Sequence, residues 1–224
     1  MRLRPGPAIL LLALSAMTGA CDAIPPYSSV RKQEVSGLNA IKLRGTIWSN
    51  LQIEAKDTTY PFAAPVGYEL DKFSSYGIEF ERLIKVGDSS QYSLTFAYET
   101  RDMQIEGTGT PVQGEQIHAG MRRYFGDRAL TAFVTAQAIY HQSLDFPGEL
   151  GLDLRESDDF LGIGVGGGAN LALSSHFSVE VYGIYETAPG AKTYKRRVDG
   201  PNAPADLEFN FSGAMIYVGL GYHF

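Results

Sequence analysis

From Leu38 to the end of the chain, the sequence alternates between apolar positions and small or polar ones with a period of two. This period indicates β-strands whose two faces meet different surroundings, whereas a surface helix repeats about every 3.6 residues. No helical stripe persists in this part of the sequence. We expect eight strands, at residues 39–50, 74–87, 91–106, 113–125, 129–144, 159–173, 176–187 and 209–224.

The connections between these segments alternate between short and long. Those after the second, fourth and sixth strands are tight turns of a few residues. The others, at about 51–73, 107–112, 145–158 and 188–208, are mostly polar and rich in Gly and Pro. In bacterial outer-membrane barrels, short turns face the periplasm and long loops face outside. The pattern predicts an all-β fold, a membrane-spanning antiparallel up-and-down β-barrel of about eight strands in a bacterial outer membrane, with both termini periplasmic and the long loops extracellular.

The last predicted strand has the clearest alternation. Ile216, Val218, Leu220, Tyr222 and Phe224 share one face, and small or polar residues occupy the other. This strand resembles the final strand of bacterial outer-membrane proteins, which implies that Tyr222 and Phe224 form the signal read by the barrel-assembly machinery. The alternative is an edge strand of a soluble sandwich, but such an edge would expose the apolar face to water.

The N-terminal residues predict export. Arg2 and Arg4 precede a short apolar run and then small residues, so residues 1–20 are predicted to be a secretory signal peptide. The apolar run is too short to span a bilayer. Residues 21–37 are polar, contain Pro and lack periodicity, which predicts a periplasmic linker before a barrel at 38–224.

Cys21, the only cysteine, leaves two processing routes open. The residues that end at Cys21 (MTGAC) loosely resemble a bacterial lipobox, with Thr where Leu is commonest, which implies lipidation of Cys21. Ordinary cleavage after Ala20 or Ala23 also fits, because small residues stand where the peptidase reads.

Charge and motifs narrow the function classes. Without Arg2 and Arg4, 17 of the 19 Lys and Arg remain against 25 Asp and Glu, and this acidic balance argues against a nucleic-acid partner. The sequence has no His-Glu-x-x-His spacing and no phosphate-binding loop, since the glycines at 166–168 lie inside a predicted strand. Neither a metal nor a cofactor is expected.

The same alternation turns a set of charged and polar side chains toward the barrel interior. They are Lys42, Arg44, Glu79, Glu81, Glu99, Arg101, His118, Arg122 and Glu180, together with Gln137, His141 and His223. An eight-stranded barrel leaves room for side chains but not for a wide pore, and buried charges must pair. We therefore expect a lumen plugged by paired charges. The alternative is a narrow ion or solute channel, gated by breaking Glu–Arg pairs.

Arg82 departs from the pattern, because strict alternation directs it toward lipid. A charge near the bilayer midplane costs about 2–4 kcal/mol in a membrane barrel. Either Arg82 lies near the periplasmic rim or a bulge shifts the register of its strand.

The plan of eight strands, short inner turns, long outer loops and a polar interior resembles the small outer-membrane barrels of the OmpA/OmpX type. The resemblance covers residues 38–224 in pattern and implies an integral envelope protein with a structural, surface-interaction or small-solute role. The expected partners are outer-membrane lipid and lipopolysaccharide, and the oligomeric state stays open. The last long loop carries a basic cluster that is either solvated or meets lipopolysaccharide phosphates: Lys192, Lys195, Arg196 and Arg197.

One motif raises an enzymatic alternative. His141 and Ser143 form a His-x-Ser pair with Glu149 and Glu156 downstream, which is similar to the esterase triad of lipid A deacylases. The Asn that follows Ser in that family is Leu144 here, and the alternation turns the pair into the lumen, away from lipid. We therefore expect no enzyme.

Overall fold

A computed structural model describes most of the predicted barrel. The described residues are 39–57, 66–86, 90–106, 111–125, 129–145, 158–174, 176–188, 193–195 and 206–224. The predicted signal peptide (1–20) and linker (21–37, with Cys21) lie outside these ranges. Within the ranges, no helix combines the length and the apolar character needed to cross a membrane.

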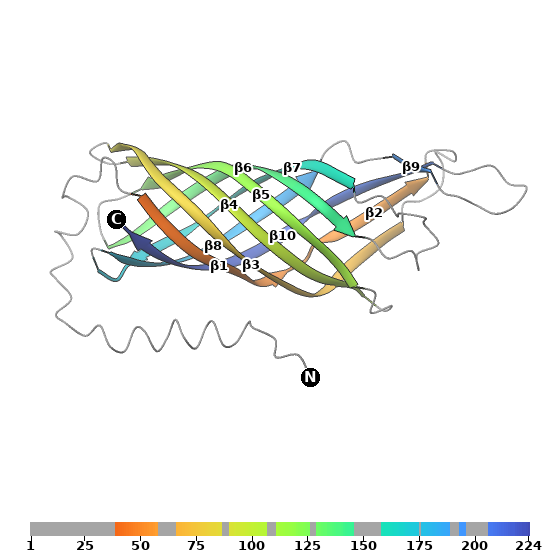
Figure 1. The fold of residues 1–224 in the computed structure, drawn as a ribbon, viewed down its shortest axis with the longest axis horizontal. Coiled ribbons are helices and arrows are strands. Elements are labelled where there is room, and N and C mark those ends of the chain that lie inside the picture. The colour runs from red at the N-terminus through yellow and green to blue at the C-terminus, as the bar shows by residue number, and fades with distance from the viewer. Residues whose placement is uncertain are drawn as a thin grey trace, which may run out of the picture.

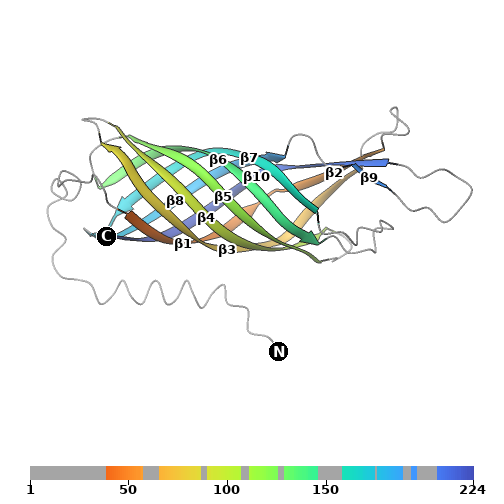
Figure 2. The same cartoon turned by 45° about the horizontal axis from the view of Figure 1, so that its top comes forward.

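The described structure is built from β-strands, all paired antiparallel. The strands are β1 (Asn39–Ser49), β2 (Gln52–Asp57), β3 (Val66–Val86), β4 (Ser90–Ile105), β5 (Pro111–Phe125), β6 (Leu130–Asp145), β7 (Asp158–Ala172), β8 (Phe177–Ala188), β9 (Thr193–Lys195) and β10 (Asp206–His223). Figure 1 shows them tilted around a common axis, and Figure 2 shows the same wall after rotation.

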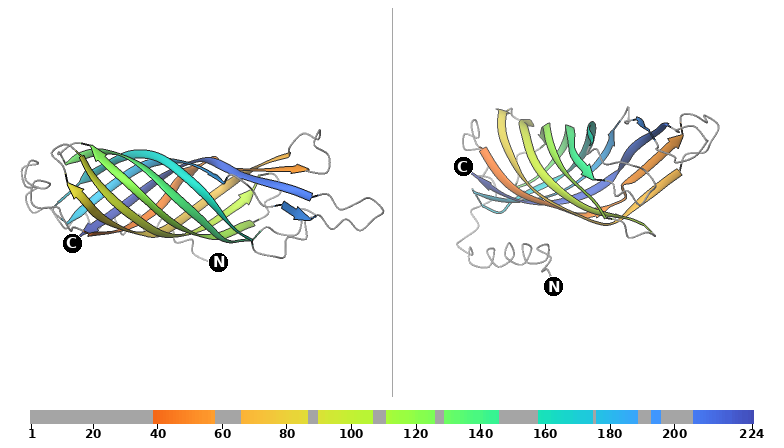
Figure 3. Two further views of the ribbon diagram at one scale, coloured as in Figure 1. Left: turned by 90° about the horizontal axis from the view of Figure 1, so that it is seen from above. Right: turned by 45° about the vertical axis from the view of Figure 1, so that its right-hand side comes forward.

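These strands close into an eight-stranded barrel, as the alternation predicted. β1 and β2 follow one another along one side of the wall, since both pair with β3 and with β10. The wall then runs from β3 to β8 in sequence order, and β8 pairs with β10 to complete the circle. The three-residue β9 pairs only with the start of β10. Figure 3 shows the tilted strands from two further directions.

Both ends of the barrel chain meet at one rim. The Asn39 amide donates to the Phe224 carbonyl at 2.9 Å, and the Phe224 amide donates to the Asn39 carbonyl at 2.9 Å. The short connections β3–β4, β5–β6 and β7–β8 lie at this rim, which we call the turn end. We call the opposite rim the loop end.

The prediction of a loop at 51–73 was wrong. β2 begins at Gln52 and β3 begins at Val66, so a strand pair extends the wall toward the loop end. β1 and β2 are separated where Asn50 accepts a hydrogen bond at Oδ1 from the Ala214 amide, at 2.6 Å. Gly213 fits closely there, because a Cβ would lie 2.6 Å from the Leu51 Cα. The polar, irregular sequence of this hairpin concealed its strands.

The outward face of the wall is apolar and bordered by aromatic rings. Large side chains are about half exposed along the strands, for example Leu43 at 51%, Leu94 at 50% and Val165 at 56%. Eight aromatic side chains on this face are exposed: Tyr76, Tyr98, Tyr140 and Tyr185 toward the loop end, and Phe125, Phe177, Tyr222 and Phe224 toward the turn end. The outer surface is therefore suited to lipid hydrocarbon with aromatic girdles at its borders.

Arg82 lies near the turn end, with its side chain exposed. It is opposite Asn39, the first residue of β1. The register of β3 against β4 shifts between Asp71 and Ser74 and again between Leu83 and Lys85. Between these shifts Arg82 keeps the outward parity of Phe80, so neither turns it inward. Of the two explanations for this residue, the rim position is correct.

Candidate functional site

The barrel interior is the candidate functional site. The structure buries there all nine charged residues that the alternation directed inward: Lys42, Arg44, Glu79, Glu81, Glu99, Arg101, His118, Arg122 and Glu180. Gln137 and His141 are also buried, and His223 is half-buried with its Nε2 2.8 Å from the Ser178 hydroxyl. Glu186, which the prediction omitted, is buried as well. It shares the parity of Glu180 on the same strand, so the alternation could have identified it.

The half of the network nearer the turn end is organised around Lys42. Its Nζ lies 2.6 Å from Glu81 Oε2 and 2.6 Å from Glu180 Oε2. Glu81 also accepts hydrogen bonds from Ser93 and, at 2.7 Å, from the Tyr124 hydroxyl. These contacts tie side chains of β1, β3, β4, β5 and β8 together, so the interior charges are shared among strands that do not all pair with one another.

Arg122 bridges two carboxylates across the lumen. Its Nη1 lies 3.0 Å from Glu180, and its Nη2 lies 2.9 Å from Glu79. The guanidinium carbon is 4.9 Å from the ring centre of Phe133 and 5.0 Å from that of Tyr182. The rings contribute cation–π attraction and restrict the guanidinium to one position.

The half nearer the loop end continues through Arg44 and Arg101. Arg44 contacts Glu79 at 3.1 Å and Glu99 at 2.9 Å. Arg101 contacts Glu99 at 2.9 Å and Glu186 at 3.0 Å. Since β4 carries Arg101 and β8 carries Glu186, this last pair joins opposite walls of the barrel.

The network brings together five carboxylates and four Lys or Arg side chains, all buried. The fifth carboxylate, Glu186, is shared between Arg101 and a histidine, since its Oε1 lies 2.6 Å from His141 Nε2. His118 lies 3.8 Å from Glu99. The acidic and basic groups are thus nearly balanced, which low-dielectric surroundings require of buried charges.

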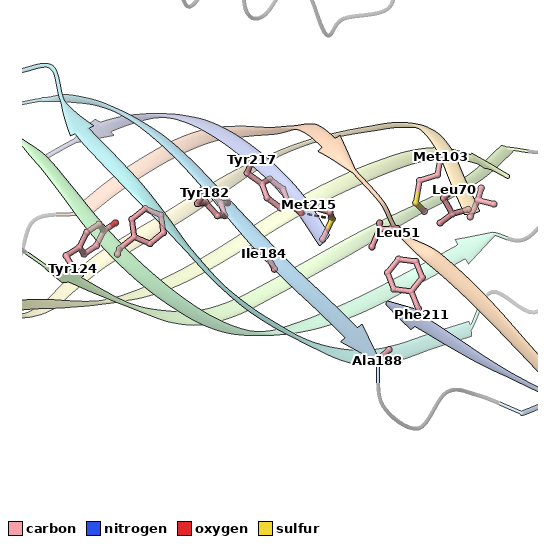
Figure 4. Close-up of a cluster of buried hydrophobic side chains, with 12 residues drawn as sticks. Leu51, Leu70, Met103, Tyr124, Tyr182, Ile184, Ala188, Phe211, Met215 and Tyr217 are labelled. Carbon is pink, nitrogen blue, oxygen red and sulfur yellow. Dashed lines mark hydrogen bonds between the residues drawn. The ribbon is translucent and has the colours of Figure 1, made fainter. Parts of the chain in front are cut away.

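An apolar layer lies inside the loop end of the barrel. Leu51, Leu70, Met103 and Val112 are buried there with Phe211, and Phe73 and Phe160 pack against the same cluster. Figure 4 shows Leu51, Leu70, Met103 and Phe211 beyond Ile184 and Met215, away from Tyr124. The prediction of a lumen plugged by paired charges did not include this layer, because Leu51, Leu70 and Val112 were assigned to loops.

His141 lies between the charge network and the apolar layer. Its ring stacks on Phe160 at 4.1 Å between centres, and its Nδ1 is 2.7 Å from the Gln116 amide nitrogen. With Nε2 against Glu186, both ring nitrogens face buried partners. The Ser143 side chain and the whole of Glu149 and Glu156 lie outside the described residues, so the structure does not test the alternative of an esterase triad.

The other predicted site residues are placed as follows. Tyr222 and Phe224 stack at 6.3 Å between ring centres on the outer surface of the turn end. Of the basic loop cluster, Lys195 ends β9, while Lys192, Arg196 and Arg197 lie outside the described residues. No group of three metal-ligating side chains occurs within the described part of the chain.

Comparison with known proteins gives likeness in structure but not in sequence. No protein-family model and no curated sequence matches the chain. The outer-membrane protein OprG from Pseudomonas aeruginosa is similar, with a TM-score of 0.50 and 14% identity over 84% of this chain and 96% of that one. Neisserial surface protein A has a TM-score of 0.48 and 12% identity, over 82% of this chain and 96% of that one. The Ail protein of Yersinia pestis has a TM-score of 0.42 and 16% identity, over 84% of this chain and 99% of that one.

The architecture of the chain is that of an all-β protein with a closed, antiparallel, eight-stranded barrel. The chain has the fold of the small β-barrels of bacterial outer membranes. At these identities the likeness concerns the fold alone, so the function must come from the residues of this chain.

Proposed function

We propose that this chain is an integral protein of a bacterial outer membrane, with a structural or surface-interaction role, no enzymatic activity and a lumen closed by paired charges. One observation carries the proposal: the charged side chains of β1, β3, β4, β5 and β8 pair across the barrel interior. The turn end faces the periplasm, and the loops at the other end face outside, as in barrels of this kind.

The outer surface supports membrane insertion. A contiguous band of half-exposed Leu, Ile, Val and Phe side chains surrounds the wall. Soluble proteins rarely expose apolar patches larger than a few hundred Å², whereas hydrocarbon accommodates such a band without penalty. The expected partners follow from this placement: membrane lipid around the wall, lipopolysaccharide at the loop end, and the barrel-assembly machinery that reads Tyr222 and Phe224 during biogenesis.

The interior supports a closed lumen. Lys42, Glu99 and Arg122 are each at most 1% exposed, so the network leaves their charges no contact with solvent. Removing one partner of such a buried pair costs about 3–5 kcal/mol, which sets a high barrier to opening a path by separating charges. The apolar layer at the loop end adds a second obstruction to ions, since it offers them no polar ligands.

Planar-bilayer recording tests this proposal. Purified protein that shifts on unheated gels and gives β-type circular dichroism is expected to insert without producing ion conductance. A matched double variant, Arg101→Ala with Glu186→Ala, removes the pair that joins opposite walls and is expected to raise conductance. Steady conductance by the unmodified barrel would instead support the narrow channel.

The esterase alternative has its own test. The protein is expected to leave the acyl chains of lipid A unchanged when it is expressed in a bacterial outer membrane. Loss of an acyl chain, measured by mass spectrometry of lipid A and abolished by Ser143→Ala, would contradict the non-enzymatic proposal.

A further inference from the structure

Two arginines on the outer surface carry charges that the described barrel does not neutralise. Arg82 of β3 and Arg123 of β5 are exposed near the turn end, on either side of β4. Among the described residues, neither guanidinium has a carboxylate within 4.0 Å, whereas each of the four interior cations has at least two. Within the described part of the chain, these two charges on the outer surface therefore have no carboxylate partner, which leaves them suited to an anion of the surrounding membrane.

The surface around Arg82 is apolar. Leu94 lies opposite it on β4 and is 50% exposed, while Phe80 and Ile84 flank it along β3. A cation amid lipid-facing side chains is tolerated only near the membrane border, because its cost falls from about 2–4 kcal/mol at the midplane to nearly zero there. The position of Arg82 opposite Asn39, at the start of β1, provides that border.

Arg123 is held in place by two rings. Its guanidinium carbon lies 5.4 Å from the ring centre of Tyr92 and 5.1 Å from that of Phe125. Cation–π attraction acts on the face of a guanidinium, whereas its N–H donors lie in the plane. The donors therefore stay available for a phosphate, which two parallel N–H groups bind well.

The register brings the two arginines within reach of one lipid headgroup. Arg82 is opposite Leu94 and Arg123 is opposite Tyr92, so the two sites are offset by two residues along β4. With neighbouring strands about 4.8 Å apart and residues about 3.3 Å apart, their Cα atoms are about 12 Å from each other. Side chains as long as arginine can converge over that distance. Figure 2 shows the three strands side by side.

We propose that Arg82 and Arg123 form a binding site for the phosphate of an anionic glycerophospholipid in the leaflet at the turn end. The acyl chains would lie along the apolar side chains of β3 and β4, and the headgroup would lie at the aromatic border. This site rests on the proposed function, since it requires the barrel to span a membrane. Lipopolysaccharide is not the occupant, because it occupies the other leaflet under the proposed orientation.

Lipid retention tests the site. The full chain is folded into vesicles with equal amounts of phosphatidylglycerol and phosphatidylcholine and extracted in mild detergent, and the lipid that stays bound is counted by mass spectrometry. The unmodified protein is expected to retain phosphatidylglycerol preferentially. The double variant Arg82→Gln with Arg123→Gln is expected to retain about fivefold less phosphatidylglycerol than the unmodified protein. Phe177→Gln is the matched control: it places the same residue at the same rim, on β8 across the barrel, and should retain as much as the unmodified protein.

Two results would overturn the site: equal retention of phosphatidylglycerol by the double Gln variant and the unmodified protein, or equal retention of the two lipids by the unmodified protein. The shift on unheated gels separates this failure from that of the proposed function. A chain that inserts and shows no lipid preference refutes the site alone, and a chain that does not insert refutes both.

Discussion

Removal of Arg122 should destabilise the barrel more than its volume explains. Arg122→Met keeps an unbranched apolar side chain between Phe133 and Tyr182 but removes the contacts to Glu180 at 3.0 Å and to Glu79 at 2.9 Å. Both carboxylates are about 1% exposed and would lose a counter-charge. Stranding buried charges in this way costs about 3–5 kcal/mol.

The paired variant isolates the charge effect. Arg122→Met with Glu180→Gln removes one charge of each sign. The ion pairs of Lys42 with Glu81 and of Arg44 with Glu79 remain in this double variant. Replacing a buried ion pair as a whole is often neutral. We therefore expect the double variant to recover at least half of the free energy of unfolding lost in the single variant.

The chain offers its own fluorescent reporter for this measurement. Trp48 is the only tryptophan, and it lies on the outer surface of β1 at 49% exposure. Its emission should shift to longer wavelength as urea unfolds the barrel from lipid vesicles, which gives the free energy of unfolding for each variant. A loss below about 1 kcal/mol in Arg122→Met, or a double variant no more stable than the single one, would refute the assigned pairing.

Three further changes test other parts of the barrel with the same titration. Leu43→Lys puts a charge on the lipid face opposite Leu220 and should lower the free energy of unfolding by about 2–4 kcal/mol; no loss would mean that this face does not meet hydrocarbon. Gly213→Ala should lower it by about 1–3 kcal/mol, because the added Cβ meets backbone 2.6 Å away at Leu51, and an unchanged value would contradict that close approach. Phe133→Ala should lower it by about 3–5 kcal/mol by leaving a cavity beside Arg122, and a loss below about 1 kcal/mol would show that the ring is not packed there.

Alternation predicted the barrel well because each strand position meets either lipid or the interior. The parity of Lys42, Glu99 and Arg122 followed directly from this rule, and all three are buried. Their pairing did not follow, since the rule assigns a side chain to a face but not to a level along the barrel axis. Arg101 meets Glu186 only because the stagger of the strands brings β4 and β8 to the same level.

Two features were missed in the prediction from the sequence, for one physical reason. The hairpin formed by β2 and the start of β3 reaches toward the loop end, where a strand needs no apolar outer face, so the pattern faded although the hydrogen bonding continued. The apolar layer with Leu51 and Leu70 depends on these strands and was lost with them. The location of Arg82 at the rim, by contrast, required the position of the strand ends, which the sequence gives only within a few residues.

The hydrogen bonds between Asn39 and Phe224 have a consequence for the order of folding. They join the first and last residues of the barrel, so the seam between β1 and β10 unites the most distant parts of the barrel sequence. Contacts this far apart demand the largest loop-closure entropy and form late. The wall cannot be completed until β10, the last of these strands in chain order, is available to pair with β1. Until then both seam edges stay unpaired, and a helper that holds one edge would protect the nascent sheet from pairing with another chain.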